Sequence, residues 1–413
     1  MEFCAYIGID WADKKHDFCL KVTGSEKLER GSLLQKPEAI DAWARALYKR
    51  FSGKKIAVCL EQSKGGLIFA LMKYDFLVLY PVNPRTLARY REAFALSRAK
   101  DDPSDAQFLM ELITTHIDKL RAWKPETKET RLLQRLTQER VKLINDMKRL
   151  GNRLTNLLKE YFPQALEIFP VIYRNVVADF ILTYPTLEIA KKASEQELVN
   201  FFRKHTSGTA KTSLKRIGII KNSIPLTTDD AIINASSLMA KATVQQIKTL
   251  NSVIDEFDKQ IQELYANHPD MPIIDSLPGA GEVMGPRLIA ALGTDRSKFD
   301  SAEELSCFTG IAPVVERSGN HSWTHWRFFC NKPLRQAFID WTFLSIRHSI
   351  WAEAFYKQQR AKGKSHSIAI RALAFKWLRI IFKLWKSNLK YNESTYLKAL
   401  QKSGSPIIKA IAA

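Results

Sequence analysis

The sequence predicts an α/β domain at the N-terminus, followed by an all-α region whose middle part is a coiled coil. Three observations lead to this prediction. Strand-like and helix-like patterns alternate over the first hundred residues, two later stretches have apolar heptad spacing, and the residues after 270 are helical and strongly basic. A chain of 413 residues has room for two or three domains.

The N-terminal elements follow the order β-β-α-β-α-β. The expected strands and helices are, in order, residues 3–10, 17–22, 37–51, 55–61, 67–74 and 76–82. Two of the apolar strands end on an acid, Asp10 in one case and Glu61 in the other. We therefore expect both carboxylates at the rim of the sheet. A further helix is expected over residues 104–116, with Pro103 at its start.

Two heptad stretches predict the coiled coil. The apolar positions of the two runs are Leu133, Leu136, Leu143, Met147, Leu150, Leu154 and Leu157, and then Ile247, Leu250, Ile254, Phe257, Ile261 and Leu264. Arg140 is the single interruption in the first run. An antiparallel hairpin within one chain and a dimerisation arm both agree with this pattern.

The composition points to a polyanionic partner. The 63 Lys and Arg residues exceed the 43 Asp and Glu residues by 20, which favours nucleic acid or an acidic membrane surface. Residues 368–385, the most apolar stretch, carry four basic residues, too many for a membrane-spanning helix. The five cysteines form no CxxC pair, which indicates reduced thiols and a cytoplasmic location.

Four acids form the strongest candidate site: Asp10, Glu61, Asp102 and Asp105. The last two lie three residues apart at a helix start, so both can face one point. Clustered carboxylates repel one another unless a divalent cation neutralises them, and oxygen ligands suit Mg²⁺ or Mn²⁺. Two such ions about 3.5–4 Å apart can bind the attacking and leaving oxygens of a phosphoryl transfer. Taken singly, each acid is also a common helix cap or solvated position.

Candidate nucleic-acid contacts gather in the last third of the chain. Gly279 and Gly281 form a Gly-x-Gly turn that resembles the hairpin of a helix-hairpin-helix element. Such a turn either offers backbone N–H groups to a phosphate or is simply a tight interhelical connection. The basic candidates are Arg317, Arg335, Lys364, Arg371, Lys376 and Arg379. The residues after Ser403 are expected to be loosely structured.

Ser318 lies in the segment Glu316-Arg317-Ser318-Gly319-Asn320, and a Ser-Gly pair taken alone is a common turn. His321, His325 and Cys330 follow it. These are residue types that bind zinc, but no paired CxxC or matching fourth ligand accompanies them.

In their order and spacing, these blocks resemble the DEDD transposases of bacterial insertion sequences, relatives of the pilin-gene invertase. The N-terminal match comprises Tyr6-Ile7-Gly8-Ile9-Asp10-Trp11, Leu60-Glu61 and Lys100-Asp101-Asp102-Pro103-Ser104-Asp105-Ala106, the last of which is similar to the K-x-D-x-x-D-A pattern. The C-terminal match comprises Leu277-Pro278-Gly279-Ala280-Gly281, Phe299, Phe308-Thr309-Gly310-Ile311-Ala312-Pro313, Arg317-Ser318-Gly319 and Leu334-Arg335.

The resemblance implies an RNase H-like domain of the Holliday-junction-resolvase type over residues 1–122, bearing the acidic metal site. It also implies a coiled-coil and linker region over 123–270, a helical transposase domain over 271–390 and a tail over 391–413. The motif match gives Ser318 the role of nucleophile. It leaves Asp101 as an alternative metal ligand to Asp102, but the three-residue spacing to Asp105 favours Asp102. The implied partners are donor and target DNA, a noncoding bridge RNA that pairs with both, and further copies of the chain in a dimer or tetramer.

The implied reaction is Mg²⁺-dependent strand cleavage and exchange, in which Ser318 attacks the scissile phosphate and leaves a phosphoserine link. Two other functions agree with the same residues. One is a junction nuclease that uses a metal-bound water, with Ser318 structural. The other is a non-catalytic scaffold that binds nucleic acid and bridges molecules through the coiled coil.

Overall fold

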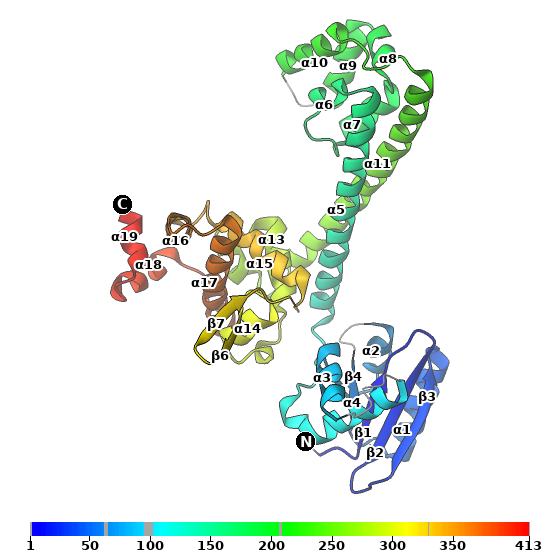
Figure 1. The fold of residues 1–413 in the computed structure, drawn as a ribbon, viewed down its shortest axis with the longest axis vertical. Coiled ribbons are helices and arrows are strands. Elements are labelled where there is room, and N and C mark those ends of the chain that lie inside the picture. Colours follow the sequence, from blue (N-terminus) through cyan, green and yellow to red (C-terminus); the bar gives the residue numbers. More distant parts are fainter. Residues whose placement is uncertain (1, 62–64, 95–101, 206–208, 329, 413) are drawn as a thin grey trace. The chain divides into compact units, whose positions relative to one another are not determined.

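The fold comes from a computed structural model that describes residues 2–61, 65–94, 102–205, 209–328 and 330–412. The side chains of residues 102 and 412 lie outside this description. The chain divides into two compact units, Met1–Pro125 and Glu126–Ala413 (Figure 1). No helix in the described ranges has both the length and the apolar composition needed to cross a membrane.

The N-terminal unit is built on a five-stranded mixed sheet. Its strands are β1 (Ala5–Asp10), β2 (Lys15–Val22), β3 (Leu28–Leu34), β4 (Ile56–Leu60) and β5 (Leu77–Pro81). They lie in the order β3-β2-β1-β4-β5. The first three form an antiparallel meander, while β4 is parallel to β1 and β5 is parallel to β4. The α/β character predicted for this part of the chain is confirmed.

Strand β3 was not expected from the sequence. It is an edge strand of the sheet, and Leu33 is its one fully buried residue, so it has no clear apolar alternation. Its position depends instead on pairing with β2. Gly31 lies directly under the ring of Phe18, where an added Cβ would come within 2.6 Å of the ring.

Helices cover both faces of the sheet. They are α1 (Pro37–Arg50), α2 (Gly66–Leu71), α3 (Pro84–Phe94), α4 (Asp102–His116) and the short η1 (Ile117–Lys119). Along β4, successive residues alternate between two cores, because Val58 packs with α1 and α2 while Cys59 packs with α3 and α4. This is the alternation expected of a strand buried on both faces.

Two long helices, α5 (Lys128–Tyr161) and α11 (Asp230–Ala266), run side by side in the second unit (Figure 1). They are antiparallel, since Thr130 near the start of α5 contacts His268 just beyond the end of α11 at 3.2 Å, while Glu160 near its end contacts Ser236. Arg140, the interruption in the heptad pattern, forms an ion pair with Asp258 of α11. Of the two arrangements left open by the sequence, the structure has the intramolecular hairpin. That the two helices wind around each other as a coiled coil stays a prediction.

A helical cluster joins the far ends of these two helices. It consists of α6 (Gln164–Ile168), α7 (Asn175–Thr183), α8 (Leu187–Lys192), α9 (Glu195–His205) and α10 (Ala210–Asn222). Its core is rich in phenylalanine, with Phe162, Phe180 and Phe202 fully buried. In Figure 1 this cluster lies at one end of the α5–α11 pair.

The rest of the chain is helical with one β-hairpin. Its elements are α12 (Met271–Asp275), α13 (Gly281–Leu292), η2 (Arg296–Lys298), α14 (Ala302–Phe308), β6 (Val314–Ser318), β7 (His321–His325), α15 (Lys332–Ser345), α16 (Ile350–Ala361), α17 (His366–Ser387), α18 (Glu393–Lys402) and α19 (Pro406–Ala412). The core contains four fully buried tryptophans, Trp341, Trp351, Trp377 and Trp385. The helical C-terminal region predicted from the sequence is confirmed, but the β6–β7 hairpin within it was not expected.

The expectation of a loose structure after Ser403 is wrong. Residues Pro406–Ala412 form α19, which begins with a proline, a residue suited to the first helical turn. Ile407 is only 2% exposed and belongs to the main core of the unit, because α19 packs against α16. Helix α19 is too short to be stable in isolation, and its packing against α16 therefore stabilises it.

Candidate functional site

Asp10 and Glu61 lie at the same edge of the sheet. In the parallel β1–β4 ladder, Ile9 is paired with Leu60, and the two acids are the residues that follow this pair. Asp10 is 7% exposed, whereas Glu61 is partly exposed. The carboxyl ends of two neighbouring parallel strands thus carry a carboxylate each, as the sequence analysis expected.

The third described acid, Asp105, belongs to helix α4. The helix packs directly on β1 at Gly8, where an added Cβ would lie 2.1 Å from the carbonyl oxygen of Ala106. Asp105 precedes Ala106 and is 1% exposed. The side chain of Asp102, and Asp101 altogether, lie outside the described residues. Among the residues that are described, no three acidic, histidine or cysteine side chains form a group able to hold a metal ion.

Arg91 of α3 neutralises Asp105. Its Nε and one terminal nitrogen donate hydrogen bonds of 2.7 and 2.5 Å to the two carboxylate oxygens. The Arg91 side chain is 15% exposed and that of Asp105 is 2% exposed, so the pair is largely shielded from water. A buried carboxylate requires such a partner, because an unpaired charge in the interior is strongly unfavourable.

The chemistry of these donors fits a hard divalent cation. All the candidate ligands are carboxylates, and oxygen ligands are preferred by Mg²⁺ and Mn²⁺. Two of the three described acids are buried, and the bidentate bond to Arg91 shows that positive charge is stabilised at Asp105. The Arg91 guanidinium is hydrogen-bonded to both carboxylate oxygens of Asp105. A metal ion would therefore have to displace Arg91 in order to bind Asp105.

Ser318 ends strand β6 beside a two-residue turn, Gly319-Asn320, in which Gly319 has a left-handed φ of 56°. The register of the hairpin pairs Ser318 directly with His321. Residues opposite each other in an antiparallel pair have Cβ atoms about 4.5–5.5 Å apart. From the sequence, His321 was a residue of a type that binds zinc and a departure from the glycine- and serine-rich stretch expected after Ser318. The hairpin register is the signal that relates it to Ser318.

Glu316 holds the two strands of the hairpin together. One of its carboxylate oxygens accepts from Trp323 Nε1 at 2.9 Å, and the other lies 2.9 Å from His325 Nε2. The hydrogen bonds from His325 and Trp323 lower the pKa of Glu316, and the bond to Glu316 raises the pKa of His325. All three side chains are on the strands that carry Ser318 and His321.

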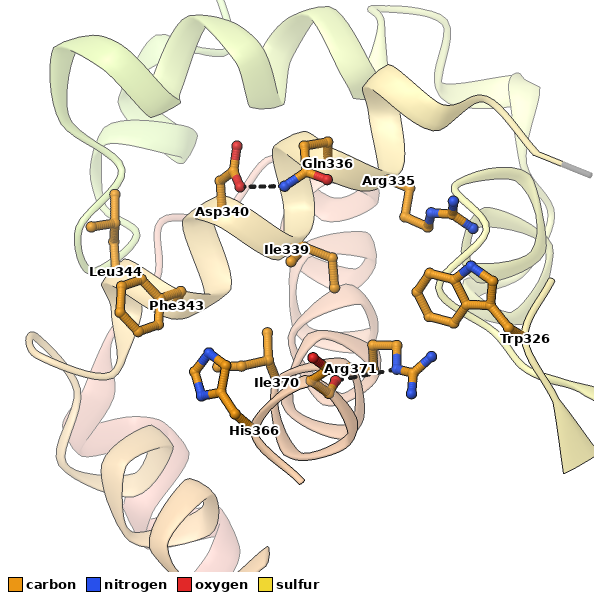
Figure 2. Close-up of a pocket in the computed structure, with 11 residues that line it drawn as sticks. Trp326, Arg335, Gln336, Ile339, Asp340, Phe343, Leu344, His366, Ile370 and Arg371 are labelled. Atoms are coloured by element: carbon orange, nitrogen blue, oxygen red, sulfur yellow. Dashed lines mark hydrogen bonds between the residues drawn. The ribbon is translucent and has the colours of Figure 1, made fainter. Parts of the chain in front are cut away.

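The basic candidates occupy different environments. Arg335 of α15 and Arg371 of α17 both stack on Trp326, with guanidinium carbons 4.3 and 4.1 Å from the ring centroid (Figure 2). Arg317 is exposed on β6. The remaining three have partners of other kinds: Lys364 donates to Gln359, Lys376 lies over Phe355, and Arg379 pairs with Glu303. The structure therefore brings two of the six arginine and lysine candidates together.

The Gly-x-Gly turn connects α12 to α13. Gly279 and Gly281 have left-handed φ values of 71° and 46°. An added Cβ at Gly279 would lie 3.0 Å from the His348 ring, whereas one at Gly281 would meet no described atom within 4 Å. Gly279 is thus required by packing as well as by its backbone, and the backbone of Gly281 is open at the start of α13.

Comparisons with known proteins match both ends of the chain. Residues 7–163 match a family model described as a transposase of the DEDD IS110 type, and residues 271–357 match one described as a transposase of the IS116/IS110/IS902 family. A mini-circle putative transposase for IS117 from Streptomyces coelicolor is 27% identical over 98% of each chain. A 42 kDa protein of insertion element IS900 from Mycobacterium paratuberculosis is 24% identical over 94% of this chain and 98% of its own. A pilin gene-inverting protein from Moraxella bovis is 29% identical over 38% of this chain and 52% of its own.

Proposed function

This chain belongs to the IS110-type family of DEDD transposases, and from that premise we propose that it exchanges DNA strands by covalent serine chemistry. It is a transposase, an enzyme that cuts and rejoins DNA. The proposal adds that Ser318 is the nucleophile, that the acids at the edge of the sheet hold a divalent cation, and that an RNA guide selects the DNA. The observation that supports it is that Asp10 and Glu61 end two neighbouring parallel strands, while α4, the helix of Asp105, packs on the first of these strands.

The metal site would be made of Asp10, Glu61 and Asp105 together with Asp102, and would hold Mg²⁺, with Mn²⁺ as a possible substitute. A divalent cation bound there supplies Lewis-acid polarisation of a phosphate. The N-terminal domain would then be RNase H-like, of the junction-resolvase type. The chain's own contribution would be to place Asp10 and Glu61 at the ends of β1 and β4 and to keep the buried Asp105 paired with Arg91 in the absence of a cation.

Ser318 would attack the phosphorus of the scissile phosphodiester through its Oγ. His321, opposite in the hairpin, would accept the hydroxyl proton as the Oγ–P bond forms. The bond from phosphorus to the leaving sugar oxygen breaks, and that oxygen takes a proton, which His321 can return. One phosphoester bond replaces another, so the covalent phosphoserine link retains the capacity to rejoin the strand.

Several copies of the chain would act together with nucleic acid. The acidic edge lies in the N-terminal unit and Ser318 in the second unit, and we propose that the two chemical groups meet on DNA within a dimer or tetramer. The net charge of +20 supports strong, salt-dependent contact with nucleic acid. A noncoding bridge RNA that pairs with donor and target DNA is the proposed second partner.

Covalent trapping tests this function. The protein is incubated with Mg²⁺, its flanking RNA and labelled junction-spanning DNA, and the products are separated on a denaturing gel. The wild type is compared with Ser318→Ala, Asp10→Asn and the control Ser322→Ala, which removes an exposed serine from the same hairpin. We expect a protein–DNA adduct in the wild type and in the control, and none in the other two variants.

Two other results would change the conclusion. Cleaved DNA without an adduct, unaffected by Ser318→Ala, would indicate a junction nuclease that uses the acidic site with water as the nucleophile. Binding without any cleavage, in all variants and at every Mg²⁺ or Mn²⁺ concentration, would indicate a non-catalytic nucleic-acid scaffold.

A further inference from the structure

A cavity of about 550 Å³ lies between α15, α17 and the segment that follows the β6–β7 hairpin. The residues that define its character are Trp326, Arg335, Phe343, His366, Ile370 and Arg371. Figure 2 shows Arg335 and Arg371 on either side of Trp326 at one end, and Phe343 and His366 toward the other. The volume is within the range of about 300–1,000 Å³ that is usual for small-molecule sites.

The two arginines bring uncompensated positive charge to this cavity. Each donates a hydrogen bond to a backbone carbonyl, Arg335 to that of Arg327 and Arg371 to that of Ser367. Within the described part of the chain, neither guanidinium forms an ion pair with a carboxylate. Burial and the charge of Arg335 lower the pKa of Arg371. Two like charges held on one indole ring favour an anion beside them.

The acid that lines the cavity does not supply this anion. Asp340 accepts a hydrogen bond of 2.8 Å from Arg287 and one of 2.6 Å from Gln336. Its negative charge is therefore already neutralised by α13. The guanidinium nitrogens of Arg335 and Arg371 that lack a backbone partner remain available to an anion from outside the chain.

The other end of the cavity is largely apolar, with the His366 ring edge-on to Phe343 at a centroid distance of 5.6 Å. Phe343 is 42% exposed although it lies beside the buried Ile370, and Ile339 continues the same wall. An aromatic ring open to solvent beside an apolar wall suits a planar heterocycle, which gains from stacking. A cavity that offers two guanidinium groups at one end and such a wall at the other matches one nucleotide, with its phosphate and its base.

We propose that this cavity binds one unpaired nucleotide of the DNA strand that Ser318 attacks. Trp326 directly follows β7, whose other end forms the turn next to Ser318. Five residues of strand, at about 3.3 Å each, separate the cavity from that turn by roughly 17 Å. A paired base is stacked inside a duplex and cannot enter a pocket, so the site selects single-stranded DNA. That the bound nucleotide belongs to the DNA strand under attack rests on the proposed role of Ser318, whereas binding of a nucleotide in the cavity does not.

Binding of labelled oligonucleotides to the full-length protein, followed by fluorescence anisotropy at one salt concentration, tests the inference. The probes are an oligo-dT single strand, a duplex of the same length and an oligo-U RNA. The variants are Arg335→Gln, Arg371→Gln and Phe343→Ala, with Lys357→Gln as the control. Lys357 pairs with Glu353 on the surface of α16 and does not line the cavity, so its loss removes the same charge elsewhere. Phe343→Ala leaves both arginines and Trp326 in place.

We expect the three cavity variants to weaken binding of the DNA single strand by at least about 5-fold, the lower end of what base stacking contributes. The affinity of these three variants for the duplex should fall no further than the affinity of the control Lys357→Gln for the duplex. Equal losses for single strand and duplex would overturn the inference, since the arginines would then act only through general charge. A loss confined to the RNA probe would also overturn it. Ser318→Ala should bind the single strand like the wild type, so failure of the serine proposal would be seen separately, in the covalent adduct.

Discussion

Replacement of Arg91 by glutamine tests how positive charge is held at the acidic edge. The variant leaves the carboxylate of Asp105, with a side chain 2% exposed, without its bidentate partner. Breaking a buried ion pair from one side costs about 3–5 kcal/mol. If the opening of α4 limits amide exchange, this energy corresponds to an increase in exchange rate of roughly 150- to 5,000-fold. The control is Arg89→Gln, an exposed position on the same helix.

The assay is hydrogen exchange with mass spectrometry on peptides from β1, α3 and α4 of the full-length protein. It is run once with a chelator and once with excess Mg²⁺. In the chelator, Arg91→Gln should exchange much faster than the wild type and Arg89→Gln. With Mg²⁺ the variant should recover protection, because a cation at 100 times its dissociation constant stabilises the folded state by about 2.7 kcal/mol.

Two results would refute this reasoning. Unchanged exchange in Arg91→Gln without metal would mean that the ion pair does not stabilise the contact of α4 with β1. Fast exchange that Mg²⁺ leaves unaltered would mean that the edge of the sheet does not accept a cation in place of the guanidinium, and the proposed metal site would be wrong.

Three further predictions concern the hairpin and the sheet. His321→Ala should slow formation of the covalent adduct by about 10²–10⁴-fold without weakening DNA binding, as measured by timed quenching, because it removes the proposed proton acceptor. The ion pair of Glu316 with His325 should stabilise the hairpin at pH values above the lowered pKa of Glu316 and below the raised pKa of His325, where both groups are charged. The protection factors of the hairpin amides, which compare exchange with that of unprotected amides at the same pH, should therefore fall as the pH rises through the pKa of the histidine or drops through that of the glutamate. Gly8→Ala should destabilise the N-terminal unit by at least about 1–3 kcal/mol in denaturant unfolding, since its Cβ would meet backbone atoms of α4 at 2.1 and 2.4 Å. Gly218→Ala, in an open position of α10, should be neutral or slightly stabilising.

Local pattern was sufficient for four of the five strands of the large sheet and for the two long helices. The apolar runs that end on Asp10 and Glu61 became two neighbouring parallel strands, and the long heptad stretches became α5 and α11. Each of these elements buries a face with a regular period, and that period can be read along the chain. Some of the elements that were not predicted have no such period. Strand β3 and the β6–β7 hairpin are largely exposed, so their residues show little alternation, and each forms because a partner strand is adjacent.

The candidate site divides in the same way. The sequence by itself determined the residue types, namely carboxylates at strand and helix ends, a serine before a glycine, and a basic C-terminal third. Only the tertiary structure decided which of them meet. It paired Asp105 with Arg91, placed His321 opposite Ser318, and stacked on Trp326 two arginines that are 36 positions apart. The physical reason is that a period along the chain reports which face of an element is buried. The contacts between elements depend on how those faces pack, and residue order does not record that.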